Sequence, residues 1–449
     1  MTENTRSETG KKRTNNDRMD YTRQINNAGQ SSSAASAAAK IVNGARQPVP
    51  KEAVRKKKSK KSNFPPNKTV VEVQIYKEGI DRLFFMLVII MICLGTIMIF
   101  SASYANALEY YKDSYFFLKK QLKMAAIGFA AMMFTAYFVN YRFIKKLAAP
   151  FFIGILALNY ATGILGKITH GAQRWLFGFQ PSEFLKLAVV LFLASYIAQK
   201  KDKMKKIGWG IIVPLIIMAS IAGAMWMQSH LSGLIILMLI CVGVMFIGEA
   251  PIGFFIGSTA IVFAVVTYIL KYTQNFADFL IDITKKEYAA NRILAWINPF
   301  KYSQDEGYQI IQSLYAIGSG GVGGLGWGQS RQKFLYLPEP QNDFIFSIIC
   351  EEMGFIGATI IIILFVALIW RGFVIALHAP DKFSSVVVMG IMIKVAIQFI
   401  LNIAVVTNTI PNTGISLPFF SYGGTALIVL MCEMGLVLSI SRLSYQEKP

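Results

Sequence analysis

The stretch that decides the fold runs from Asp343 to Trp370 and reads DFIFSIICEEMGFIGATIIIILFVALIW. A helix of this length, rising about 1.5 Å per residue, would measure roughly 42 Å, which is more than the hydrocarbon core of a bilayer. The stretch opens with an acid, and LPEPQN precedes that acid directly. It therefore predicts a membrane-length helix whose first residue either caps the helix or takes part in chemistry.

The whole chain has the composition of a membrane protein. Of its 449 residues, 54% are hydrophobic and 16% are charged, whereas a soluble protein carries about a quarter charged residues. We therefore predict an all-α polytopic membrane protein with ten transmembrane helices. The expected spans are about 82–102, 121–139, 144–165, 182–199, 208–227, 231–249, 251–270, 343–370, 383–407 and 417–440.

The distribution of basic residues predicts the orientation of these spans. Loops rich in Lys and Arg stay in the cytoplasm, and here they share one side with both termini: 141–146, 198–206 and 371–382. The opposite side then receives 167–183, 407–424 and a large extracytoplasmic loop, 271–342, between helices 7 and 8. A loop this long in a compact bundle is usually functional, so we place the membrane domain at 81–449 and expect chemistry at its outer face.

Residues 1–80 form a separate region with a strong positive charge. They contain 17 Lys and Arg against 7 Asp and Glu, which is half of the net charge of +20. Such a polar segment buries too little apolar surface to fold, so we expect a disordered cytoplasmic tail. The run KEAVRKKKSKK (51–61) has the charge to bind nucleic acid, but its place before a membrane span favours anionic lipids as its partner and no nucleic acid.

Asp343 has two compatible interpretations. Asp is a favoured N-cap residue, and a helix is expected to start here. A carboxylate at the lipid–water boundary beside Phe344 and Phe346 would also be partly desolvated, which raises the pKa of an acid and suits a general base.

Four cations are expected on the same side of the membrane as Asp343: Arg174 in GAQRWL, Lys186 early in the fourth span, and Arg331 and Lys333 in SRQKF. A cluster of cations around one acid suits an anionic lipid, and a pyrophosphate in particular. The plainer expectation for Lys186 is a local ion pair with Glu183, three residues earlier on the same helix face.

Further ionisable residues lie deep inside the expected spans. Glu351 and Glu352 would lie about 12–14 Å below Asp343, and Lys394 about 16 Å in from the opposite face. We therefore predict a buried structural pair between Lys394 and one of these glutamates, Glu352 in particular, whereas Glu433 has no evident partner.

Two further features carry less information about chemistry. The run GSGGVGGLGWGQS (318–330) contains G-x-G-x-x-G but follows no strand, so it predicts a close-packed hinge or re-entrant turn beside a substrate channel and excludes a dinucleotide site. His170, His230 and His378 show no metal-ligand spacing, which favours generic surface or interfacial roles.

Together these motifs resemble one family. The segments FLYLPEPQNDFIFSIICEEMGFIG, RWLFGFQPSEFLKL, NPFKYSQDEGYQIIQSLYAIGSGG, GQSRQKF and TGISLPFFSYGGT are similar to those of the SEDS proteins (shape, elongation, division and sporulation). The resemblance covers roughly residues 80–443 and is closer to the FtsW/SpoVE branch than to RodA.

The resemblance implies a peptidoglycan glycosyltransferase of the bacterial plasma membrane that polymerises lipid II. It implies Asp343 as the catalytic base and Arg174, Lys186, Arg331 and Lys333 as substrate-binding residues, with Gln312 and Ser421 from the quoted motifs added to them. It also implies undecaprenyl pyrophosphate as the leaving group and a class B penicillin-binding transpeptidase as the partner, alongside other division or sporulation proteins at the septum. The resemblance implies no definite cofactor and leaves the metal requirement open, since a divalent cation, Mg²⁺ or Mn²⁺, would assist a pyrophosphate leaving group.

The sequence departs from the family at three places. It reads QSHLSG (228–233) where the family usually reads Q-P-D-L-G-T, so His230 replaces an acid and its ability to substitute for that acid is open. Asn342 precedes Asp343 where Thr is usual, and the tail before residue 80 is longer than the family needs. The same bundle and cations would also serve a lipid II flippase or a non-catalytic division scaffold, and neither of these requires a base at Asp343.

Overall fold

The structure is a computed structural model that describes residues 79–169, 172–176, 178–272, 287–304 and 306–443. All of these residues belong to one compact unit, residues 72–449. The proposed tail lies outside the described residues except for its last two positions.

Each expected span coincides with a helix. The helices are α3 Arg82–Tyr111, α4 Phe116–Phe138, α5 Tyr141–Leu165, α6 Pro181–Lys200, α7 Val213–Met227, α8 Leu231–Ile247, α9 Ile252–Lys271, α13 Ile345–Leu377, α14 Lys382–Val406 and α15 Gly424–Ser441. Within the described residues, eight helical segments are long and apolar enough to cross a membrane, while α8 and Ile252–Tyr268 are shorter apolar helices. The chain is thus a multi-pass helical membrane protein, and the number ten, the side of the long loop and the side of the termini stay predictions.

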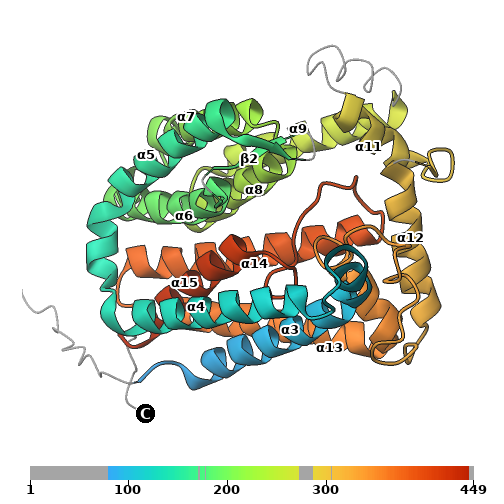
Figure 1. The fold of residues 1–449 in the computed structure, drawn as a ribbon. Helices are drawn as coiled ribbons and strands as arrows, with labels where there is room; N and C mark the ends of the chain where they lie inside the picture. The colour runs from blue at the N-terminus through green and yellow to red at the C-terminus, as the bar shows by residue number, and fades with distance from the viewer. Residues whose placement is uncertain (1–78, 170–171, 177, 273–286, 305, 444–449) are drawn as a thin grey trace, which may run out of the picture. The chain divides into compact units, whose positions relative to one another are not determined.

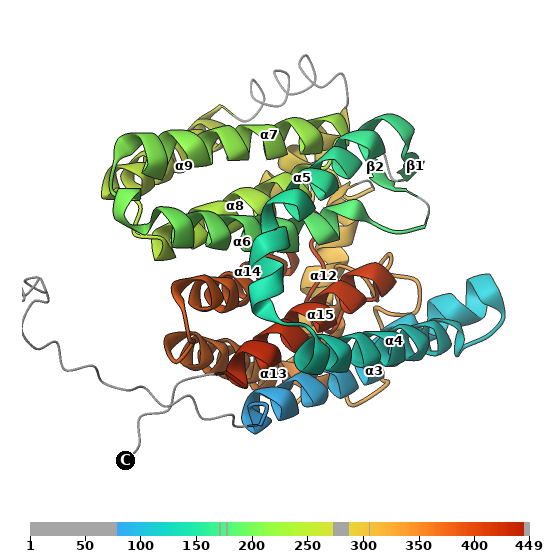
Figure 2. The ribbon, with the colours of Figure 1, turned by 90° about the vertical axis from the view of Figure 1, so that its left-hand side faces the viewer.

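The helices form two groups (Figures 1 and 2). One group contains α5, α6, α7, α8 and α9, and the other contains α3, α4, α13, α14 and α15. Helix α15 packs along α4, and α13 packs along α14 and α3. Helix α14 also contacts α6 and α8, so it joins the two groups. The face of α14 that points into the bundle carries three buried polar side chains, those of Lys394, Gln398 and Asn402.

Two short helices and a β-hairpin lie at one end of the bundle. Part of the expected 271–342 loop is helical: α11 spans Glu287–Ile297 and α12 spans Glu306–Gly320, with α12 packed against α13. A small antiparallel hairpin, β1 Lys167–Thr169 and β2 Ala172–Trp175, lies between α5 and α6 in the sequence. This hairpin places Arg174 beside α6, which β2 contacts.

The expected tenth span begins later than hydropathy indicated. Residues 411–423 are not helical, and α15 starts only at Gly424. The backbone of this segment has positive φ at Gly414 and Phe419, and Leu417 N donates a hydrogen bond to Ser421 Oγ at 2.7 Å. The segment is therefore an ordered turn that presents polar groups at the helix end.

The glycine-rich run packs closely against α13, as predicted. Gly354 interrupts that helix with φ +65°, and a Cβ there would collide with the backbone of residues 322–324. Backbone contact this close requires the absence of side chains, which explains Gly354 on α13 and Gly320 and Gly324 in the run. None of residues 318–330 lines the cavity described next, so the expected place beside a substrate channel stays a prediction.

Candidate active site

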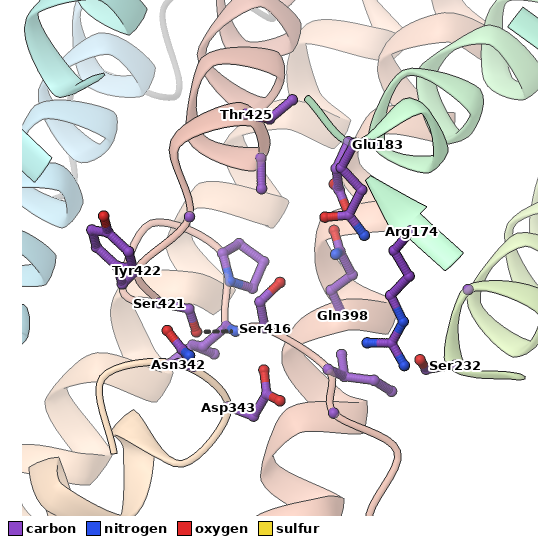
Figure 3. Close-up of a pocket in the computed structure, with 18 of the residues that line it drawn as sticks. Arg174, Glu183, Ser232, Asn342, Asp343, Gln398, Ser416, Ser421, Tyr422 and Thr425 are labelled. Carbon is purple, nitrogen blue, oxygen red and sulfur yellow. Dashed lines mark hydrogen bonds between the residues drawn. The ribbon is translucent and has the colours of Figure 1, made fainter. Parts of the chain in front are cut away.

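A cavity of about 1240 Å³ lies where the two helix groups meet. Helices α6, α8, α14 and α15 form its walls, and the segments 338–343 and 412–423 enclose it further together with residues of β2, α11 and α12. Of the residues singled out from the sequence, this cavity brings together Asp343, Arg174, Lys186, Glu183, Lys394 and Ser421. Figure 3 shows several of these side chains converging on the same space.

Asp343 lies on the cavity wall one residue before the cap of α13. The N-cap residue is Phe344, and it makes no side-chain cap hydrogen bond. The prediction that Asp343 is the N-cap residue is therefore wrong. The turn 337–344 brings the acid into the cavity, where Figure 3 shows its carboxylate pointing toward the shared space.

The backbone around Asp343 is held from α14. Asn402, which is fully buried, donates from Nδ2 to the backbone carbonyl of Asp343 at 2.8 Å and to that of Ile415 at 2.7 Å. One amide thus fastens the segment that carries the acid to the irregular segment before α15. Both segments line the cavity, so Asn402 sets their relative position.

The carboxylate itself rests against Gly414. That residue has φ +67°, and a Cβ built on it would lie 3.0 Å from Asp343 Oδ2. A side chain at this position would be strained by its backbone conformation and would press on the carboxylate. The TGIS motif thus contributes a glycine whose lack of a side chain makes room for the acid.

The cations divide into those at the cavity and those away from it. Arg174 and Lys186 line the cavity, and Figure 3 shows the Arg174 side chain reaching from β2 toward the space that Asp343 also faces. Lys186 forms the expected ion pair with Glu183, at 2.7 Å, and both residues are buried. The cavity therefore combines a carboxylate on one wall with a guanidinium and a buried ammonium on the other.

The predicted pair between Lys394 and Glu352 is wrong. Lys394 Nζ lies 2.7 Å from both carboxylate oxygens of Glu433 on α15, and both side chains are almost fully buried. Glu433 therefore has the partner that the sequence did not reveal. The error arose because depth along a helix does not fix which neighbouring helix a side chain faces.

Glu352 instead pairs with Lys333. Their Nζ–Oε1 distance is 2.9 Å, and Lys333 also donates to Ser101 Oγ and to Gly328 O. The neighbouring Glu351 accepts hydrogen bonds from Ser330 Oγ and from Arg331 N. This buried group, which we call the turn cluster, anchors residues 328–333 to α13.

Three predicted substrate-binding residues do not line the cavity. Lys333 belongs to the turn cluster, the Arg331 side chain is exposed, and Gln312 is half-buried on α12. Their roles in binding stay predictions. Ser421 lines the cavity, and its hydroxyl also accepts the hydrogen bond from Leu417 N.

Several lining residues escaped the sequence analysis. Gln398 lies one turn after Lys394 on α14, and its spacing to that lysine was a usable signal. His230 is a correction, because it is not at a surface or interface: it is 6% exposed and lines the cavity before α8. Among the described residues, no group of three or more His, Cys, Asp or Glu side chains is arranged to hold a metal ion.

Comparison with known proteins places this site in a family context. A family model for FtsW, RodA and SpoVE, described as cell cycle protein, matches residues 81–446. The chain is 39% identical over 374 residues to stage V sporulation protein E of Bacillus subtilis, covering 82% of this chain and 98% of that protein. It is 34% identical over 371 residues to the probable peptidoglycan glycosyltransferase FtsW of Geobacter sp. (strain M18), covering 81% and 97%.

Solved structures share the fold. One comes from work titled "Structural coordination of polymerization and crosslinking by a peptidoglycan synthase complex"; it has a TM-score of 0.67 and 25% identity and covers 82% of this chain and 99% of that one. The rod shape determining protein RodA of Thermus thermophilus matches with a TM-score of 0.58 at 24% identity, over 82% of this chain and 98% of that chain. The latter likeness concerns the fold alone.

Proposed function

Because this chain belongs to the SEDS family, the cell-cycle proteins FtsW, RodA and SpoVE, and is of the FtsW/SpoVE type, we infer that it is a peptidoglycan glycosyltransferase. We propose that it polymerises lipid II at the outer face of the bacterial plasma membrane during division or sporulation. The observation that carries this proposal is the shared cavity, which is lined by Asp343 on one side and Arg174 and Lys186 on the other.

In the proposed reaction, Asp343 is the general base. It takes the proton from the 4-hydroxyl of N-acetylglucosamine on the acceptor lipid II. That oxygen attacks the anomeric carbon of the reducing-end N-acetylmuramic acid of the growing chain, and the bond from this carbon to the phosphate oxygen breaks. The configuration inverts, and undecaprenyl pyrophosphate leaves with the bonding electrons.

The cations supply the second half of the chemistry. Charge develops on the departing diphosphate, and an Arg guanidinium can donate two hydrogen bonds to its oxygens. Arg174 is half-buried in the cavity wall, so its interaction with an anion is less screened than it would be in bulk water. Measuring the polymerisation rate as a chelator is added tests whether the reaction requires Mg²⁺ or Mn²⁺.

A direct experiment is polymerisation of labelled lipid II by the purified protein together with its transpeptidase partner. Asp343→Asn keeps the size and polarity of the side chain but removes the base, so glycan chains should disappear. The matched control is Asp113→Asn, which changes an acid of the α3–α4 connection that lies outside the cavity. That variant should polymerise like wild type.

The same experiment tests the alternatives. A lipid II flippase would keep its transport activity in Asp343→Asn, and a scaffold would still assemble with its partners. Wild-type protein that folds, binds its transpeptidase and yet forms no polymer would contradict the proposed function.

We further propose a class B penicillin-binding transpeptidase as the partner and the septum as the site of action. We also propose ten spans, with both termini in the cytoplasm and the loop at 271–342 outside.

A further inference from the structure

His230 has an unusual setting in the cavity wall. It occupies the N-cap position of α8, it is 6% exposed, and it contributes to the cavity lining. Its ring lies against Gly233: a Cβ at that glycine would lie 2.7 Å from Nδ1 and 2.8 Å from Cε1. The space for this imidazole therefore exists because position 233 carries no side chain.

Burial distinguishes the two ring nitrogens. Nδ1 is buried, whereas Nε2 is not among the buried side-chain atoms without a partner, so Nε2 is the nitrogen that a ligand in the cavity can reach. Nδ1 has no hydrogen-bond partner among the described residues. A buried N–H without an acceptor is rarer than a buried acceptor without a donor, so we assign the proton to Nε2.

The charges around the ring keep it neutral. Burial, followed by the positive charges of Arg174 and Lys186, holds the pKa of His230 well below its usual range. The imidazole is therefore a neutral donor placed among cations. The ligand group best suited to accept from it is one that the same cations attract, which is an anionic oxygen rather than a sugar hydroxyl.

We propose that His230 Nε2–H binds an oxygen of the substrate diphosphate, beside Arg174 in the same cavity wall. This inference rests on the proposed function, because that function supplies a lipid-linked diphosphate as the ligand. It adds a neutral donor to the cationic residues, so the site gains a directional hydrogen bond without adding charge. Gly233 is a positioning residue for this contact, because it acts only through the ring.

The test is equilibrium binding of undecaprenyl diphosphate to the purified full-length protein in detergent. His230→Ala should weaken binding roughly tenfold or more, as expected for a lost hydrogen bond to a charged group. His230→Gln carries an amide nitrogen near the place of Nε2 and should stay within about threefold of wild type. His378→Ala, which removes an exposed imidazole outside the cavity lining, is the matched control.

Two further ligands separate the possible sources of the phosphate chemistry. Undecaprenyl monophosphate should lose less affinity in His230→Ala than the diphosphate does if the histidine contacts the second phosphate group. Inorganic pyrophosphate should compete with the lipid in wild type and compete more weakly in His230→Ala. Equal competition in both proteins, with equal lipid affinity, would overturn the proposal.

Gly233→Ala supplies an independent measurement. It should reduce diphosphate affinity in wild type by displacing the ring but have little further effect in His230→Ala, where no ring remains to be displaced. Additive losses would overturn the positioning role of Gly233. If Gly233→Ala or His230→Ala fails to give monodisperse protein, diphosphate affinity is compared between His230→Gln and His230→Asn instead. Asn places its amide near the position of Nδ1, so His230→Asn should bind diphosphate weakly.

The result can be told apart from failure of the proposed function. Wild-type protein that polymerises lipid II, with a His230→Ala variant that binds diphosphate equally well, would refute this inference alone. Wild-type protein that binds diphosphate through His230 but forms no polymer would refute the glycosyltransferase function and leave the binding site intact.

Discussion

Lys394 on α14 and Glu433 on α15 form a buried ion pair with an Nζ–Oε2 distance of 2.7 Å. The pair lies in the bundle interior, and Lys394 also lines the cavity. Two desolvated charges of opposite sign tolerate burial because each provides the other's counter-charge. This relationship makes the α14–α15 contact sensitive to the loss of either residue.

Replacing one partner should cost more than replacing both. Lys394→Met leaves the Glu433 carboxylate buried without its counter-charge, which should lower the free energy of unfolding by about 3–5 kcal/mol. Lys394→Met with Glu433→Leu removes both charges and should be substantially more stable than the single variant. Thermal unfolding of the purified proteins in detergent measures the difference, and a cycle with Glu352→Gln in place of Glu433→Leu should instead be additive.

Gly414 should be required for the geometry of Asp343. Gly414→Ala adds a methyl group at a position with φ +67° and 3.0 Å from the acid's Oδ2, so we expect the carboxylate to shift and kcat to fall roughly tenfold or more. Gly321→Ala is the matched control, because Gly321 also has positive φ but has no atom within 4 Å of such a Cβ. The measurement is the steady-state polymerisation rate of each variant. Similar losses of kcat in both variants would mean that backbone strain, and not displacement of the Asp343 carboxylate, lowers the rate.

Asn402 should link activity to the position of two loops. Asn402→Asp keeps the shape of the side chain but replaces the donating Nδ2 with an oxygen, so the carbonyls of Asp343 and Ile415 lose their hydrogen bonds. We expect kcat to fall more than lipid II affinity, because the displaced group is the proposed base. Asn408→Asp is the comparison, since Asn408 donates to Trp296 O and lies outside the cavity lining. A variant at Asn402 with unchanged kcat would show that the two loops hold their positions without it.

Hydropathy and local spacing predicted the parts of this fold that depend on neighbouring residues. The apolar runs located every helix from α3 to α9 and from α13 to α15, and the three-residue spacing of Glu183 and Lys186 predicted their ion pair correctly. These features depend on the burial of one continuous segment or on one helical turn.

Features that depend on tertiary packing were beyond the sequence. The partner of Lys394 is set by the rotation of α14 against α15, and the late start of α15 follows from the turn at 411–423, whose Pro418 and hydrogen bond to Ser421 interrupt an apolar run. The sequence marked His230 as a replacement of an acid in a family motif but gave it no role in the site, because a single histidine carries no spacing signal.

Lys333 and Arg331 offer the last test, because the structure separates two cations that the sequence grouped together. Lys333→Met leaves Glu352 buried without its ion pair, so we expect the free energy of unfolding to fall by about 3–5 kcal/mol. Arg331→Gln changes an exposed side chain and should alter stability by no more than about 0.5 kcal/mol. Lipid II binding is then measured on the folded fraction of each variant. The resemblance implies that Lys333 binds substrate, whereas its pair with Glu352 outside the cavity lining leads us to expect that Lys333→Met binds like wild type. A stable Lys333→Met protein that no longer binds lipid II would place Lys333 among the substrate contacts and contradict its role in the turn cluster.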